Sequence, residues 1–145
     1  MKTTLPIAPE VQALIVQARH QVAARLHKLF KQAAMVAAIG PERAARLVEH
    51  TALGGATLGW VSSEVREAIV ERRPENKLGM FGLWHVVDAI GCLGDCKEGR
   101  WPYFTDENRR TRLQWASDEM DEVERAVMQA MGPASEQRGA EVVAA

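Results

Sequence analysis

The fold is decided by residues 105–133, which read TDENRRTRLQWASDEMDEVERAVMQAMGP. Apolar residues recur in this stretch at intervals of three and four, at Leu113, Ala116, Met120, Val123, Val127 and Ala130. That spacing places all of them on one stripe of an α-helix. Thr105 is a favourable N-cap, and Gly132 followed by Pro133 is a typical end signal. The stretch therefore predicts a long helix that packs one face against other helices.

The opposite face of this predicted helix is acidic. It carries a run of carboxylates at Asp118, Glu119, Asp121, Glu122 and Glu124. An acidic helix face is most often simply solvated, but it can also attract a basic partner. If this face has a function, we expect Asp118, Asp121 and Glu122 to belong to a partner-binding surface.

Four further helices are predicted upstream, over residues 9–39, 41–50, 56–72 and 78–93. Apolar residues recur at helical spacing in the first three, and the fourth is apolar nearly all round. Gly40–Pro41 separates the first predicted helix from the second, and Arg73–Pro74 separates the third from the fourth, because proline and the residue before it avoid a helix interior. The sequence predicts an all-α, single-domain bundle of about five helices, with a long first and a long last helix.

Residues 1–132 are expected to form the helical domain, and residues 133–145 a flexible C-terminal tail, because large apolar residues are scarce there. The first predicted helix has apolar residues seven positions apart, at Ile15, Val22, Leu29 and Val36. At about 30 residues it would be about 45 Å long, more than a compact domain of this size needs. We therefore predict self-association, most simply as a homodimer.

The charges of the chain are segregated although they nearly cancel. Of 145 residues, 47% are hydrophobic, enough for one well-packed domain, and the net charge is −1. Residues 1–48 hold seven Lys and Arg and two acids, a net of +5, whereas residues 49–145 hold eleven and seventeen, a net of −6. The two parts are expected to attract each other within the fold or a dimer, or to offer charged surfaces to partners. The overall balance makes nucleic acid the less favoured partner.

Several features predict a cytoplasmic protein without membrane contact. Two cysteines, Cys92 and Cys96, are too few for a secreted disulfide scaffold. The first nine residues lack the apolar run of a signal peptide. The most apolar segment, residues 78–94, is short for a membrane span and contains His85 and Asp88.

An aromatic stretch lies between the last two predicted helices, at Arg100, Trp101, Tyr103 and Phe104. Loops are normally polar, because exposed aromatic area favours burial. The stretch therefore either folds back as a lid on the core or offers these residues to a partner, since Trp, Tyr and Arg dominate binding hot spots. We take all four as candidate partner-binding residues.

A weak metal or redox candidate is formed by His85, Asp88, Cys92 and Cys96. Their spacings of three and four place them on one face of a helix, and imidazole, carboxylate and thiolate are zinc ligands. Four ligands on one straight helix all point the same way, however, and Gly94 indicates that the helix ends before Cys96. The simpler interpretation is a buried thiol and a hydrogen-bonded histidine, so no metal or other cofactor is expected.

The segment 55–72 faintly resembles a helix-turn-helix, because Gly59 and Val65 are six residues apart as in that motif. The resemblance implies a DNA-binding transcriptional regulator. The supposed recognition helix, however, carries Glu64, Glu67 and Glu71, which would face phosphates.

No catalytic motif is present, so we do not expect an enzyme. The segregated charge and the aromatic stretch favour a small protein-binding regulator or inhibitor that occupies a partner's surface. Such a profile suits a protein of a phage or mobile element aimed at a nucleic-acid-processing complex. The alternatives are the DNA-binding regulator and, second, the metal or redox protein using His85, Cys92 and Cys96.

Overall fold

The computed structural model describes residues 4–74, 78–93 and 101–144. These residues form six α-helices, two short 3₁₀ helices and no strand, which confirms the all-α, single-domain prediction. The α-helices are α1 (Pro9–Leu29), α2 (Ala33–Ile39), α3 (Pro41–Thr51), α4 (Leu58–Arg72), α5 (Gly79–Cys92) and α6 (Asp106–Ala144). The 3₁₀ helices are η1 (Gly54–Thr57) and η2 (Trp101–Tyr103).

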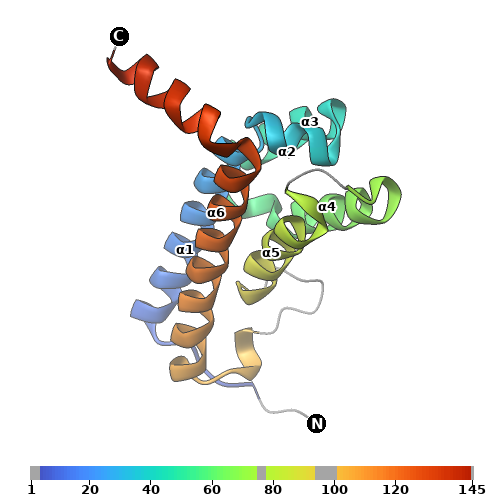
Figure 1. Cartoon of the computed structure of the whole chain (residues 1–145). Helices are drawn as coiled ribbons and strands as arrows, with labels where there is room; N and C mark the ends of the chain where they lie inside the picture. The colour runs from blue at the N-terminus through green and yellow to red at the C-terminus, as the bar shows by residue number, and fades with distance from the viewer. Residues whose placement is uncertain (1–3, 75–77, 94–100, 145) are drawn as a thin grey trace.

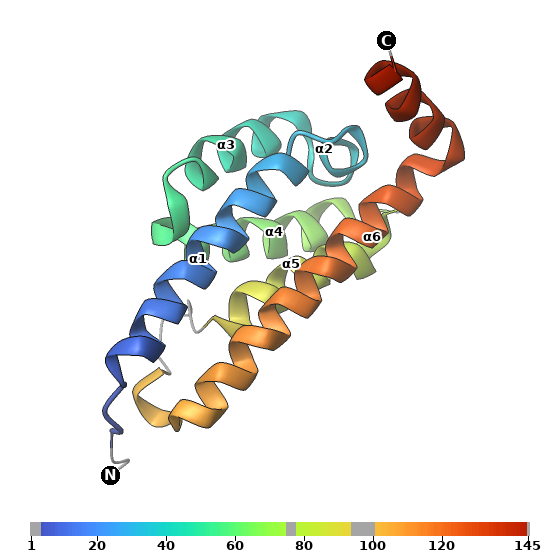
Figure 2. The ribbon, with the colours of Figure 1, turned by 90° about the vertical axis from the view of Figure 1, so that its left-hand side faces the viewer.

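Helix α6 packs one face against the other helices of the bundle. It packs along α1 on one side and along α5 on the other, and α4 covers α5 (Figure 1). Helices α2 and α3 close the end of the bundle where α1 finishes, as the second view shows (Figure 2). Ala116, Met120, Val123 and Val127 of α6 are buried, so the stripe predicted from sequence is the face that meets the core.

The first predicted helix is not continuous, which is why six helices are found where about five were predicted. Helix α1 ends at Leu29, a turn follows, and α2 begins at Ala33. The turn contains no glycine or proline. It redirects the chain so that Phe30, Met35 and Ile39 are all buried. Because tertiary packing contributes more to helix stability than local preference does, this burial overrides the uninterrupted helical pattern.

The start of α6 follows its predicted signal. The Thr105 hydroxyl accepts a hydrogen bond from the Asn108 backbone N–H at 3.2 Å, the expected N-cap contact. At the predicted end, Gly132 has φ 74° and ψ 175°, which kinks the helix. The backbone is helical again beyond this kink as far as Ala144, and the flexibility predicted for residues 133–145 stays a prediction.

A buried arginine ties the N-terminal arm, which is residues 4–8 ahead of α1, to the start of α6. Arg109 is fully buried and donates to the backbone oxygens of Leu5, Pro6 and Trp101 at 2.8–3.0 Å. It also contacts the Asp106 carboxylate at 2.5 Å. The arm is held further by the Leu5 N–H, which donates to Pro102 O at 2.6 Å. This guanidinium thus joins segments about a hundred residues apart in sequence.

Within the described part of the chain, none of the helices combines the length and the apolarity that crossing a membrane requires.

Candidate functional site

Three large aromatic side chains are exposed on α5 and α6. On α5, Phe81 is 81% exposed and Trp84 43% exposed, and on α6 Trp115 is 51% exposed. Phe81 and Trp84 are three residues apart, so they share one side of α5. The two helices are antiparallel, because His85 meets Glu119 while Gly91 meets Arg112. That register places Trp115 at the level of the C-terminal half of α5.

A histidine and two carboxylates each follow one of these aromatic residues by four positions, so each shares a side of its helix with that ring. His85 Nδ1 is 2.5 Å from Glu119 Oε2, and the donor atoms of His85, Asp88 and Glu119 all lie within 4.8 Å of one another. The Phe81 ring packs edge-on against the His85 ring, with centroids 5.7 Å apart. We call this surface the acidic aromatic face and define it by Phe81, Trp84, His85, Asp88, Trp115 and Glu119.

A small cavity of about 300 Å³ adjoins the acidic aromatic face. Phe81, His85 and Gly82 of α5 line one side, and Glu122 and Arg125 of α6 line the other. Glu122 forms an ion pair with Arg125 one turn along the helix. The cavity therefore extends the face toward the kinked end of α6.

Of the two cysteines in the predicted metal or redox site, Cys92 belongs to α5 and Cys96 lies outside the described residues. Cys92 is half-buried one turn beyond Asp88. Burial raises the pKa of its thiol, the Arg112 guanidinium opposes this, and the charges of Glu119 and Asp88 raise the pKa further. The thiol is therefore protonated at neutral pH, and a protonated thiol is a poor nucleophile.

The aromatic stretch before α6 is divided between core and surface. Trp101 is only 6% exposed, and its ring packs edge-on against Phe104. The Arg112 guanidinium lies 4.7 Å over the Phe104 ring. Tyr103 is exposed, and Arg100 lies outside the described residues. Trp101 therefore packs as a lid on the core. Because it is buried within the chain, its place among the candidate partner-binding residues is corrected.

The acidic residues singled out from sequence are engaged within the chain. Arg25 of α1 binds Asp121 and Glu124, each at 2.6 Å. Glu122 pairs with Arg125, and Asp118 accepts a hydrogen bond from the Gln114 amide at 3.0 Å. Asp118 is also about 18 Å along α6 from Asp106, where the helix begins after the aromatic stretch. The acidic candidates thus make contacts within the chain, and their role in a partner-binding surface stays a prediction.

The segment that resembles a helix-turn-helix is also tied into the fold. Glu64 and Glu71 of α4 accept hydrogen bonds from Arg43 of α3, at 3.1 and 2.9 Å. Arg72 donates to the Ala38 carbonyl at the end of α2, at 3.2 Å. Glu64 and Glu71 thus hold α4 against α3 through Arg43. The DNA-binding hypothesis stays a prediction.

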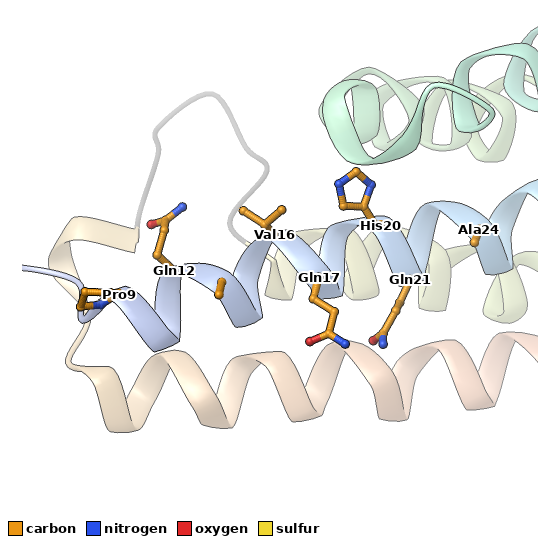
Figure 3. Close-up of a pocket in the computed structure, with 8 residues that line it drawn as sticks. Pro9, Gln12, Val16, Gln17, His20, Gln21 and Ala24 are labelled. Carbon is orange, nitrogen blue, oxygen red and sulfur yellow. The ribbon is translucent and has the colours of Figure 1, made fainter.

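The outward face of α1 forms a second, open depression of about 810 Å³. Its lining comes entirely from α1 and contains no Asp, Glu, Lys or Arg. It consists of Pro9, Gln12, Ala13, Val16, Gln17, His20, Gln21 and Ala24. Figure 3 shows Gln17 and Gln21 on the side of α6, with Val16 and His20 on the opposite side. The residues predicted to drive self-association are elsewhere, because Ile15, Val22 and Leu29 are buried in the chain's own core.

The acidic aromatic face combines residues from two helices that the sequence pattern alone does not connect. His85 and Asp88 were recognisable as a helical pair, but the third donor is Glu119, 34 residues from His85. The segment 78–93 is apolar nearly all round, so its pattern does not reveal that Phe81 and Trp84 are exposed. A contact between two helices is needed to bring the set together.

Comparison of the chain with known family models, with curated proteins and with solved structures found no match in any of the three.

Proposed function

We propose that this protein binds another protein, and that the acidic aromatic face receives a basic segment of the partner. The observation that carries the proposal is the exposure of Phe81, Trp84 and Trp115, each four residues before a member of the His85–Asp88–Glu119 cluster on the same helix. An exposed aromatic group of this size marks an interaction site more often than it marks ordinary surface. Two carboxylates, Asp88 and Glu119, belong to the same face and favour a cationic ligand.

Arginine and lysine side chains fit both components of the face. A guanidinium or ammonium group gains from lying over an aromatic ring, by about 0.5–2 kcal/mol depending on desolvation. Asp88 and Glu119 add charge-assisted hydrogen bonds, for which arginine is the best-matched donor. Tryptophan is also among the residues that most often dominate binding energy at interfaces. The face therefore suits an arginine-containing segment better than an apolar or acidic one.

A protein of this kind acts by occupying a surface, which is the regulator or inhibitor role expected from the sequence. Surfaces that bind nucleic acid are rich in Lys and Arg, because these residues neutralise phosphates. An acidic aromatic face competes for the same surfaces. A cytoplasmic nucleic-acid-processing complex is thus a fitting target class, and a mobile genetic element is a fitting source of such an inhibitor.

The proposal is tested with a nine-residue arginine peptide, and a glutamate peptide of the same length as the control. Trp84→Ala and Trp115→Ala should each weaken arginine-peptide binding about tenfold or more, because each removes a ring from the contact. Met128→Ala on α6 is the matched control, because Met128 is equally exposed but does not belong to the face. Calorimetric titration supplies the affinities. Equal affinity for the two peptides, or unchanged affinity in both tryptophan variants, would contradict the proposal.

A second candidate function is binding of a divalent metal ion by His85, Asp88 and Glu119. The observation that favours it is the convergence of three donor atoms from two helices. Imidazole and carboxylate ligands suit Zn²⁺ and Co²⁺, which bond them at about 2.0–2.2 Å. This set differs from the one predicted from sequence, because the ligand atoms that converge are those of His85, Asp88 and Glu119 of α6.

Titration with Co²⁺ and Zn²⁺ separates the two functions. Metal binding predicts saturable uptake that His85→Ala abolishes, while His20→Ala on the exposed side of α1 leaves it unchanged. Because the ion would neutralise the carboxylates, Zn²⁺ should also weaken binding of the arginine peptide. Absence of uptake by the unaltered protein at millimolar metal would exclude the metal function and leave the protein-binding proposal standing.

A further inference from the structure

We propose that a second copy of this chain docks antiparallel on the outward face of α1. The centre of this face is formed by Ala13, Gln17, His20 and Ala24, which are spaced four, three and four residues apart and all exposed. They lie opposite the stripe that α1 buries in the bundle. The face is the open depression of Figure 3, and it belongs to a different helix from the acidic aromatic face.

Opposite charges stand at the two ends of this face. Glu10 lies in the first turn of α1 and Lys28 in the last, and both are exposed. They are 18 residues apart, which is five helical turns, so they point to the same side about 27 Å apart. The two arginines between them point elsewhere. Arg25 binds Asp121 and Glu124 of α6, and the Cβ of Arg19 packs against Gly55.

This charge arrangement selects the direction in which two copies pair. A two-fold axis perpendicular to the helix at residue 19 brings each Glu10 level with Lys28 of the other copy, so the pair forms two such contacts. The same axis sets Ala13 within one residue, about 1.5 Å, of the level of Ala24, and Gln17 equally close to the level of His20. A parallel pairing would instead place Glu10 against Glu10 and Lys28 against Lys28, which is repulsive.

The side chains on the face also suit close contact between two helices. Ala13 and Ala24 are small, so two backbones can approach each other at both of these positions. Val16 and Leu14 are partly exposed on either side of the row formed by Ala13, Gln17, His20 and Ala24, and they add apolar area to the face. One helix from each copy covers less area than the roughly 800 Å² per partner of a standard stable interface. The pair is therefore a reversible dimer, whose population depends on protein concentration.

The experiment is a charge-swap series measured by sedimentation equilibrium. The unaltered protein should dimerise in the micromolar to millimolar range. Glu10→Lys and Lys28→Glu should each weaken dimerisation about tenfold, because each creates two repulsive contacts. The double variant E10K/K28E should regain the original affinity within about threefold, since attraction is restored with the signs exchanged. Arg66→Glu on α4 controls for the change of net charge.

Both substituted side chains are exposed, and circular dichroism verifies that each variant remains helical. Ala24→Arg adds a test through bulk, and it should abolish the dimer without unfolding the chain. A monomer at all concentrations would overturn the proposal, and so would a double variant that associates no better than the single ones. Because Trp84 and Trp115 lie outside this face, these results are independent of arginine-peptide binding.

Discussion

At the scale of single residues, the structure depends on polar side chains that sequence periodicity does not single out. Arg109 is the clearest example. In the sequence it is one of two neighbouring arginines in the first turns of α6, and nothing distinguishes it from Arg110. In the fold it is fully buried and joins the arm, η2 and α6, whereas Arg110 is exposed. Its role comes from backbone oxygens far away in sequence, so no local pattern could predict it.

Arg109→Met should therefore be strongly destabilising. The substitution leaves the carbonyls of Leu5, Pro6 and Trp101 without their donor, and removing one partner of a buried charged network costs about 3 kcal/mol or more. Arg110→Met is the matched control and should change stability by no more than about 0.5 kcal/mol. Urea unfolding gives both values. Equal stability of the two variants would contradict the role assigned to Arg109.

The candidate site shows the same limit of prediction. The acidic run of α6 was evident in the sequence, but its members differ in what they contact. Asp121 and Glu124 face Arg25 on α1, whereas Glu119, between them and the N-terminus of the helix, faces His85 on α5. Which carboxylate reaches which neighbour depends on how α6 is rotated between two helices. Sequence alone therefore identified the run but not the member that completes the site.

At the scale of elements, helices that contain their own start and stop signals were predictable. Helix α3 begins at Pro41 as predicted, and α4 ends at Arg72, followed by Arg73 in a left-handed conformation with φ 43° just before Pro74. The break between α1 and α2 was not predictable, because its cause is burial of Phe30 and Met35 rather than a local signal. Local chemistry thus determines the boundaries, and packing determines where a continuous pattern is interrupted.

The contact between η1 and α1 gives an element-scale prediction. A Cβ added to Gly55 would lie 2.5 Å from the Cβ of Arg19, so Gly55→Ala must push η1 away from α1. Overpacking of this kind costs about 1–3 kcal/mol. In contrast, Gly91→Ala in α5 meets nothing within 4 Å, and should be neutral or stabilise the protein by up to about 1 kcal/mol. Thermal melting distinguishes the two, and similar melting temperatures would show that this close contact is not needed.

At the scale of the whole molecule, the segregation of charge has a structural use. Arg25 binds Asp121 and Glu124, nearly a hundred residues away, and Arg43 binds Glu64 and Glu71. Each of these pairs joins the basic N-terminal part of the chain to the acidic remainder. The net charges of the two parts therefore contribute to docking α1 on α6 and α3 on α4. The carboxylates Asp88 and Glu119 lie apart from these pairs, at the acidic aromatic face.

The central claim, that the acidic aromatic face binds a basic segment, is tested most directly by nuclear magnetic resonance. The four tryptophans give four indole N–H signals, and only Trp84 and Trp115 belong to the face. On addition of the nine-residue arginine peptide, these two signals and the amides of His85, Asp88 and Glu119 should shift together. The signals of Trp60 and buried Trp101 should stay in place. Shifts confined to other residues, or no saturable shift at the face, would contradict the claim.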